Sequence, residues 1–196
     1  HRVNVTGTLN MLIASRDEGV KRFIYASSSS VYGDSPTLPK VETMTPQPLS
    51  PYAISKLAGE LYAQAFHRLY GLPTIGLRYF NIFGPRQDPT SEYAAVIPKF
   101  ITAIARGASP TIFGDGEQTR DFNFVANAVD ANVRAMTCEA GAFGGTYNVA
   151  CSQRISLLDL VAAVNGIFGA SVRPVHAEVR PGDVKHSLAD ISAAGE

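Results

Sequence analysis

The chain has 196 residues, 45% of them hydrophobic, which is enough for one substantial core or two small ones. Lysine plus arginine and aspartate plus glutamate number 17 each, so net charge gives no reason to propose a nucleic acid or an anionic membrane as partner. No apolar run reaches membrane-spanning length, and Cys138 and Cys151 show no metal-ligand spacing, so we expect two reduced thiols in a cytoplasmic protein without a metal site.

The first two predicted elements are a helix and a buried strand. An apolar stripe runs through residues 2–18 and stops at Gly19, which predicts a helix with one face made of Val3, Val5, Leu9, Leu12 and Ile13. Residues 22–28 form a nearly continuous apolar run that ends in serines, which is typical of a parallel strand buried on both faces. Ligands of open α/β sheets bind beyond the carboxyl ends of the strands, where Ser27–Ser30 fall. The alternative for this serine run is a flexible polar loop.

A second helix is predicted over residues 52–70, after a proline-bearing loop at 45–51. Gly71 is the expected C-cap, and the apolar face is wider than one contact with a sheet requires; its members are Leu57, Ala58, Leu61, Tyr62, Ala65, Phe66 and Leu69. Tyr52 and Lys56 lie one turn apart on this helix, and an ammonium group beside a phenol favours the phenolate. A nearby serine hydroxyl can hold an alcohol oxygen while the proton moves. Taken alone, this spacing also fits an ordinary amphipathic helix.

The rest of the chain alternates strands with helices. Strands are predicted at 73–80, 111–113, 145–150 and 172–177, and helices at 94–106, 127–138 and 156–168, the last with Ser156 as N-cap and Asp159 in its first turn. This alternation predicts an α/β fold with a parallel sheet. We expect one domain from residues 1–81 and 124–150, and a smaller lobe over the strand ends from residues 82–123 and 151–196.

The order of three segments resembles that of a known family. Ser27–Gly33, Tyr52–Lys56 and Leu77–Asn81 follow one another as in the extended short-chain dehydrogenase/reductase family of NAD-dependent epimerases and dehydratases. Within that family the chain is most similar to the UDP-N-acetylglucosamine and UDP-glucose 4-epimerases. The resemblance implies a Rossmann-like, doubly wound sheet that binds NAD, and a smaller lobe that binds a UDP-sugar.

The resemblance also implies roles for the residues around the strand end. Tyr52 is expected to be the acid/base, and Lys56 to favour its ionised form and hold the nicotinamide ribose. Ser28 is expected to hydrogen-bond the reacting O4 and to lie against the cofactor. Tyr79 and Phe80 would pack near the nicotinamide.

On the substrate side, Arg120 and Arg180 are expected to hold the diphosphate, since a guanidinium grips phosphate oxygens with parallel hydrogen bonds. By the resemblance, Asn81 would also bind the diphosphate, Phe113 would stack on uracil and Asp183 would bind the ribose. Ser187 matches a position where a small residue leaves room for an N-acetyl group. The alternatives are surface salt bridges for the arginines, plain core for Phe113 and plain surface for Ser187. The remaining expected substrate contacts are Ser29, Ser30, Gln87, Ala95, Val96 and Thr111.

The residues beside Ser28 distinguish branches of the resembled family. Dehydratases and a sugar-acid decarboxylase branch place an acidic residue there, whereas this chain has Ser29 and Ser30. Residues 86–89 and 93–100 resemble the 4-epimerase branch. We therefore expect a 4-epimerase, with another nucleotide-sugar dehydratase or decarboxylase, or a non-catalytic UDP-sugar-binding fragment, as alternatives.

Two further expectations concern the whole protein. No G-x-G-x-x-G sequence occurs, although backbone donors of such a loop cradle the pyrophosphate of a dinucleotide. By the resemblance, the chain is a fragment that lacks the first half of the nucleotide-binding domain and the extreme C-terminus, and it would be inactive alone. The resemblance further implies a homodimer formed through the helices at 2–18 and 52–70. Asn127 departs from the family, which commonly has an acidic residue there.

Overall fold

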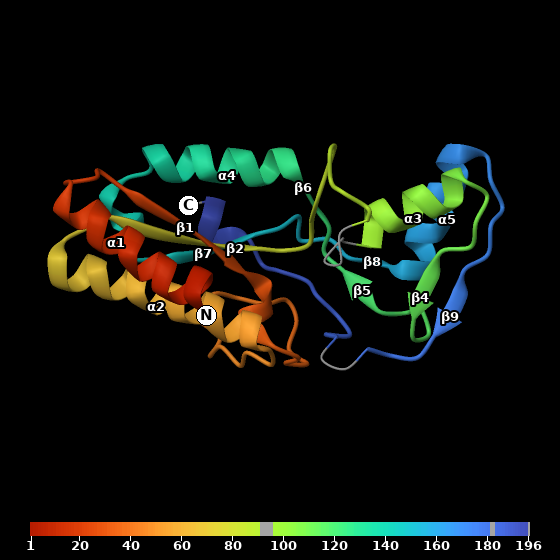
Figure 1. Ribbon diagram of the computed structural model, residues 1–196, viewed down its shortest axis with the longest axis horizontal. Coiled ribbons are helices and arrows are strands. Elements are labelled where there is room, and N and C mark those ends of the chain that lie inside the picture. The colour runs from red at the N-terminus through yellow and green to blue at the C-terminus, as the bar shows by residue number, and fades with distance from the viewer. Residues whose placement is uncertain (91–95, 181–182, 196) are drawn as a thin grey trace.

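The computed structural model describes residues 1–90, 96–180 and 183–195. The chain is elongated, with a sheet-containing lobe at one end and a smaller lobe at the other (Figure 1). The sheet has three parallel strands in the order β1 (Phe23–Ser28), β2 (Thr74–Tyr79) and β7 (Thr146–Val149). Ser28 is paired with Tyr79, and Tyr79 with Val149, so the three strands end at the same level.

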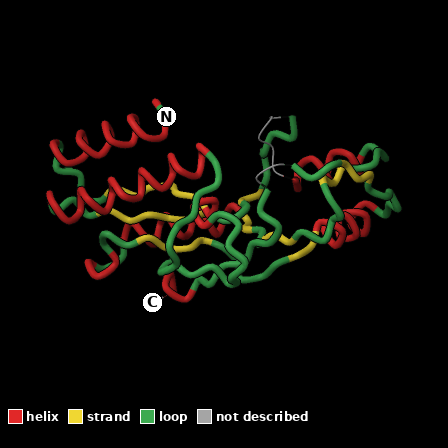
Figure 2. Tube along the Cα trace, turned by 90° about the horizontal axis from the view of Figure 1, so that it is seen from below, coloured by secondary structure: helices red, strands yellow, loops and turns green. Residues whose placement is uncertain are grey.

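Helices cover both faces of this sheet. A short π-helix (Arg2–Gly7) leads into α1 (Thr8–Asp17), which lies beside α2 (Pro51–Tyr70) on one face, and α4 (Val125–Thr137) covers the other (Figures 1 and 2). Alternation along β2 explains the two layers, since successive side chains point to opposite faces of a strand. Ile75 and Leu77 pack with Ala135 of α4, whereas Thr74, which precedes Ile75 and so points to the other face, hydrogen-bonds the carbonyl of Ala63 on α2.

Local signals set the ends of α2. The Ser50 side chain accepts a hydrogen bond from the amide of Ala53 at 3.1 Å, and Pro51 occupies the first helical turn. Gly71 closes the helix with φ of 69°, a left-handed conformation that glycine adopts at low cost. The predicted helix over 52–70 and its C-cap are therefore confirmed.

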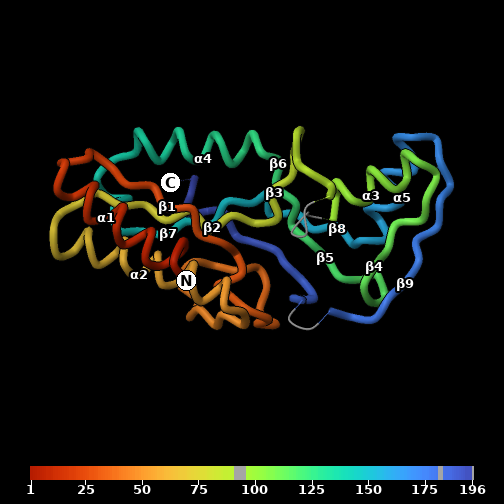
Figure 3. The backbone as a smooth tube through the Cα atoms, viewed as in Figure 1, coloured from red at the N-terminus to blue at the C-terminus, as the bar shows by residue number. Residues whose placement is uncertain are grey.

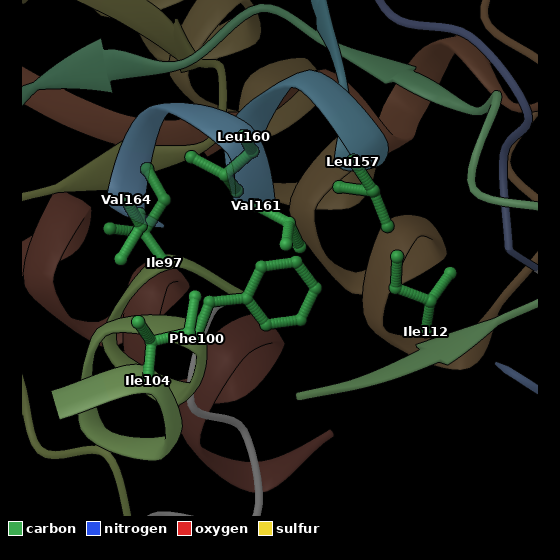
Figure 4. Packing of buried hydrophobic residues seen from close by; sticks show 8 residues of the cluster. All are labelled: Ile97, Phe100, Ile104, Ile112, Leu157, Leu160, Val161 and Val164. Atoms are coloured by element: carbon green, nitrogen blue, oxygen red, sulfur yellow. The ribbon is translucent and has the colours of Figure 1, made fainter. Parts of the chain in front are cut away.

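The smaller lobe is built around an apolar cluster between α3 (Val96–Ala105) and α5 (Leu157–Phe168), seen in Figure 4. The buried members of the cluster are Ile97, Phe100, Ile104, Ile112, Leu157, Leu160, Val161 and Val164. Two pairs of short strands flank it. β4 (Thr111–Phe113) runs parallel to β9 (Val175–Ala177), and β5 (Thr119–Arg120) runs antiparallel to β8 (Ile155–Ser156).

The two lobes are joined by several crossings of the chain. β3 (Ile82–Phe83) pairs with β6 (Asn123–Phe124) between them. Beyond β9 the chain returns from the smaller lobe to the sheet and ends in α6 (Ser192–Gly195), as Figure 3 shows. In this last segment, His186 forms an isolated β-bridge with Thr119 of the smaller lobe, and Ala189 forms one with Lys40 beside the sheet.

The predicted α/β class with a parallel sheet is confirmed, and the elements differ from prediction mainly at their ends. The expected helix over 2–18 is a π-helical turn followed by α1, and the helix expected at 127 begins at Val125. The strand expected from Val172 begins at Val175, because Pro174 has no amide donor and the Asn165 side chain bonds both the amide and the carbonyl of Val172. Within the described residues, no helix is both long and apolar enough to cross a membrane.

Candidate active site

The serine run forms a tight turn at the end of β1. Ser28 is the last residue of the strand and the N-cap of a short 3₁₀-helix (Ser29–Tyr32). Its Oγ accepts hydrogen bonds from the amide of Ser30 at 3.2 Å and from the Ser30 hydroxyl at 2.9 Å. The strand end therefore presents an ordered pair of hydroxyls, with Ser29 half-buried between them.

Tyr52 and Lys56 share one face of the first turns of α2. The Lys56 ammonium donates to the carbonyl of Ala26 at 2.8 Å and lies 5.8 Å from the centroid of the Tyr52 ring. Tyr52 is 50% exposed, so its phenol is open to a ligand. Burial lowers the pKa of Lys56. The structure thus fixes Lys56 to β1 at Ala26, two residues before Ser28, with Tyr52 one helical turn away on α2.

Tyr79 is the last residue of β2 and Phe80 is the next residue, but their side chains have different surroundings. The Tyr79 hydroxyl accepts a hydrogen bond from Asn132 of α4 at 2.7 Å, and burial raises the pKa of this tyrosine. Phe80 is 1% exposed and packs in a cluster with Val31 and Tyr32. Both rings therefore serve the packing at the strand ends, one on each side of the sheet.

Asn81 and Ser187 meet where the returning chain passes the sheet. The Asn81 side-chain amide donates to the carbonyl of Asp121 at 3.0 Å and to the Ser187 hydroxyl at 3.1 Å. The same hydroxyl accepts from the amide of Asp121 at 3.2 Å. Ser187 is thus a polar junction between three segments.

A cavity of about 160 Å³ opens in the smaller lobe, lined by Phe113, Gly114, Asp115, Gln118, Arg120, Val179, Asp183, Val184 and Lys185. Three of the predicted substrate contacts, Phe113, Arg120 and Asp183, therefore line one cavity. The Arg120 guanidinium donates to the carbonyls of Thr119 at 2.9 Å and Lys185 at 3.0 Å. Burial lowers its pKa, an effect that the carboxylate of Asp183 opposes.

Arg180 contacts one of the cavity residues, with its guanidinium carbon 3.6 Å from the centroid of the Phe113 ring. This places a cation over an aromatic face, an attractive arrangement. The structure therefore brings Arg180 next to Phe113, the residue that the family resemblance leads us to expect against uracil. Thr111, on the same strand, is exposed at the start of β4.

Gln118 is a cavity residue that sequence reasoning missed. Its Nε2 donates to the carbonyl of Phe113 at 2.6 Å, while its Oε1 is buried and without a partner among the described residues. A buried acceptor without a donor is costly, so this oxygen is suited to a ligand N–H or O–H. Its position two residues before Arg120 is the one sequence signal that could have indicated it.

The remaining predicted contacts fall in the stretch of sequence between β3 and the first residue of α3. Gln87 also has a buried Oε1 without a hydrogen-bond partner in the described part of the chain. Val96 begins α3 and packs against the apolar cluster of the smaller lobe. Ala95 lies outside the described residues. In the described ranges, no group of three or more histidine, cysteine or acidic side chains is placed to hold a metal ion.

The family follows from comparison with known proteins. The family described as "NAD dependent epimerase/dehydratase family" matches residues 1–150. The chain belongs to this family. Its serine turn and its Tyr52–Lys56 pair both lie within the matched residues.

Individual relatives are similar over nearly the whole chain. A UDP-glucose 4-epimerase of Mycolicibacterium smegmatis is 40% identical over 99% of the chain, which spans 61% of that protein. A UDP-N-acetylglucosamine 4-epimerase of Methanobrevibacter ruminantium, solved with UDP-N-acetylmuramic acid, has a TM-score of 0.95 and 43% identity, with coverage of 99% of this chain and 62% of that one. A UDP-glucuronic acid 4-epimerase of Bacillus cereus, solved with UDP-glucuronic acid and NAD, has a TM-score of 0.91 and 33% identity, with coverage of 100% and 61%. The chain therefore spans about three fifths of the length of the relatives it matches.

Proposed function

We propose that the complete protein carrying this chain is an NAD-dependent UDP-sugar 4-epimerase, acting on UDP-N-acetylglucosamine or UDP-glucose and their 4-epimers. The observation that carries the proposal is the position of the Lys56 ammonium, 2.8 Å from the Ala26 carbonyl and one helical turn from Tyr52. This geometry sets a phenol, an ammonium and the Ser28 hydroxyl at the carboxyl end of one strand, where α/β sheets bind ligands.

The residues near Lys56 fit a nicotinamide ribose. A lysine ammonium has three N–H donors, and the hydrogen bond to Ala26 orients the group while the other donors can reach ribose hydroxyls. When bound, NAD would accept the hydride from C4 of the sugar and return it to the opposite face. The partial burial that lowers the pKa of Lys56 also strengthens the electrostatic effect of its ammonium on the Tyr52 ring.

The chain's own residues would handle the proton. The Tyr52 phenolate would take the proton from O4, and the Lys56 ammonium would favour that charge on the oxygen. Ser28 would hydrogen-bond O4, since its Oγ is held in place by two donors from Ser30 and retains its own proton as a donor. The same tyrosine would return the proton when the sugar is reduced, so the reaction has no net redox change.

The cavity of the smaller lobe would hold the UDP group. Arg120 and Arg180 would neutralise the diphosphate, with Asn81 at the strand end beside it, and the buried Gln118 oxygen could accept a hydrogen bond from the nucleoside. Phe113 would offer one ring face to uracil, with Arg180 on the other face as in the present arrangement. Asp183 would bind the ribose.

Small residues support both the proposed type of reaction and the proposed sugar. Ser29 and Ser30 stand where dehydratases and decarboxylases of the family have an acidic residue, which favours epimerisation over elimination or loss of carbon dioxide. Ser187 has a small side chain, which favours space for an N-acetyl group. Gln87, Ala95, Val96 and Thr111 remain proposed substrate contacts.

Two proposals concern the assembly and its location. Both α1 and α2 carry large apolar side chains that are more than half exposed, including Met11, Ile54 and Leu61. A second copy of the chain would cover them, which supports a homodimer through these helices. Cys138 and Cys151 are free thiols, which supports a cytoplasmic location.

The test uses the complete protein incubated with UDP-N-acetylglucosamine and, separately, with UDP-glucose, with the 4-epimers quantified by chromatography. The proposal expects conversion of at least one substrate and its loss in Tyr52→Phe, which removes only the phenolic oxygen. Formation of a UDP-4-keto-6-deoxy sugar or a UDP-pentose instead would show that the branch is wrong.

A second candidate applies to residues 1–196 on their own, namely UDP-sugar binding without turnover. It is favoured by the lack of a G-x-G-x-x-G sequence in these residues, together with the grouping of Phe113, Arg120 and Asp183 at one cavity. Binding of UDP to residues 1–196 in calorimetry, without epimer formation, is the expected result. Measurable epimerisation by these residues alone would contradict it.

A further inference from the structure

A buried ion pair lies directly behind the candidate active site. Glu60 of α2 accepts two hydrogen bonds from Arg78 of β2, Nε to Oε1 at 2.9 Å and Nη2 to Oε2 at 2.8 Å, and the two residues are 2% and 4% exposed. Burial opposes the charge on Arg78, but the carboxylate of Glu60 outweighs it and raises the pKa of the arginine. A buried pair of this kind adds little stability compared with well-packed apolar residues, yet loss of either partner is costly. Its main effect is to fix the two elements relative to each other.

The pair belongs to a set of contacts between α2 and the last residues of β1. The Tyr25 hydroxyl donates to the carbonyl of Lys56 at 3.2 Å, and the carbonyl of Ala26 accepts from the Lys56 ammonium at 2.8 Å. The Ser27 hydroxyl then donates to Oε1 of Glu60. The three residues that precede Ser28 are therefore each hydrogen-bonded to the helix that carries Tyr52.

Arg78 holds the other end of the serine turn. Its Nη1 donates to the Tyr32 hydroxyl at 2.9 Å, and that hydroxyl donates to Oδ1 of Asn148 on β7 at 2.7 Å. Tyr32 is 2% exposed and is the last residue of the 3₁₀-helix that Ser28 caps. Glu60 thus fixes the residue just before the turn through Ser27, and Arg78 fixes the residue that ends it.

We propose that Glu60 and Arg78 are positioning residues for the reaction, which hold the turn Ser28–Tyr32 in register with Tyr52 and Lys56 on α2. This inference rests on the proposed epimerase function. Neither side chain is placed to touch substrate or cofactor, since both are buried between the helix and the sheet. Small displacements of reacting groups are expensive, about a hundredfold in rate for a shift of about 1 Å. Because neither side chain contacts the substrate, we expect the effect to fall mainly on kcat, with a change in KM of less than about threefold.

The experiment compares Glu60→Gln with Thr74→Val in the complete protein. Glu60→Gln keeps the size of the side chain and removes its charge. Thr74 is the matched control, because it is 1% exposed and its hydroxyl donates to the carbonyl of Ala63 at 2.9 Å, a buried bond between β2 and the far half of α2. Both variants lose stability, but only Glu60→Gln is expected to lower kcat, by about tenfold or more with KM within about threefold.

A second readout follows hydrogen exchange of the backbone amides under native conditions. Faster exchange at residues 26–32 and 53–56 is expected in Glu60→Gln but not in Thr74→Val. Where Glu60→Gln fails to fold, Ser27→Ala gives a milder test, because it removes only the bond from the strand to the carboxylate. A folded Glu60→Gln or Ser27→Ala protein with the wild-type kcat would overturn the inference, as would an equal loss of kcat in Thr74→Val. A wild-type protein without epimerase activity in the same assay would instead refute the proposed function.

Discussion

The close contact between α2 and β1 can be tested with the substitution Gly59→Ala. A Cβ atom at this position would lie 2.2 Å from the Tyr25 hydroxyl oxygen and 2.3 Å from the Cζ atom of that ring. Tyr25 cannot readily move aside, because it is 6% exposed and its hydroxyl is bonded to the carbonyl of Lys56. Overpacking of this kind costs about 1–3 kcal/mol, and replacement of glycine by alanine within a helix returns about 1 kcal/mol. Contacts of 2.2 and 2.3 Å are far inside the van der Waals distance, so the upper part of that range applies, about 2–3 kcal/mol, and we expect a net loss in the free energy of unfolding of about 1–2 kcal/mol.

Gly166→Ala in α5 is the matched control. Apart from its two chain neighbours and the nearby backbone of α5 itself, no atom of the described residues lies within 4 Å of the Cβ position there, so the helix-propensity gain is unopposed and the protein should be as stable or slightly more stable. Urea unfolding followed by circular dichroism measures both variants. With a slope of about 2 kcal/mol per molar, Gly59→Ala should lower the midpoint by about 0.5–1 M. A Gly59→Ala protein as stable as the wild type would refute the contact and the reasoning built on it.

Three further predictions concern the core, a buried phenol and the cavity of the smaller lobe. Phe100→Ala empties the centre of the α3–α5 cluster, where Phe100 is 2% exposed, and should cost about 3–5 kcal/mol in urea unfolding; a loss below about 1 kcal/mol would contradict the packing. Burial, with the charge of Glu60, raises the pKa of Tyr25 to about 12, so the stability that the neutral phenol contributes is complete below about pH 10 and lost by about pH 12. Between pH 9 and pH 11 the free energy of unfolding should therefore decline less in Tyr25→Phe than in the wild type. An equal decline in both proteins would argue against the shift. Arg120→Lys keeps the charge but loses the planar fork, so initial rates in the complete protein should show a KM raised by about tenfold with a smaller change in kcat, and an unchanged KM would remove Arg120 from the UDP site.

Short-range patterns were sufficient to predict most elements of the fold. The proline-bearing loop before residue 52, the glycine at 71 and the apolar spacing between them predicted α2 within one residue of its observed bounds. The serine run after an apolar strand also indicated the end of β1 correctly. These signals are local, because caps and periodicity depend on neighbours within a few residues. The predicted first residue of β9 was wrong, because the start of this strand depends on the side chain of Asn165 from the preceding helix.

The candidate site was less accessible from the sequence because its contacts join distant segments. Phe113, Arg120 and Asp183 line one cavity, and the contact of Arg180 with the Phe113 ring could not be predicted from their spacing. The bond between Ser27 and Glu60, which are 33 residues apart, has no pattern in the sequence. Glu60 lies one turn after Lys56, and charged residues at this spacing on a helix are usually solvated, so no local pattern indicates that Glu60 is buried.

The central claim is that the site moves a hydride from C4 and returns it to the other face, with Tyr52 handling the O4 proton. The most direct measurement uses UDP-glucose or UDP-N-acetylglucosamine carrying deuterium at C4, incubated with the complete protein in ordinary water. The account predicts that the 4-epimer forms with deuterium retained at C4, and that Tyr52→Phe forms none. Loss of the deuterium to solvent during epimerisation would contradict hydride transfer and with it the proposed role of the site.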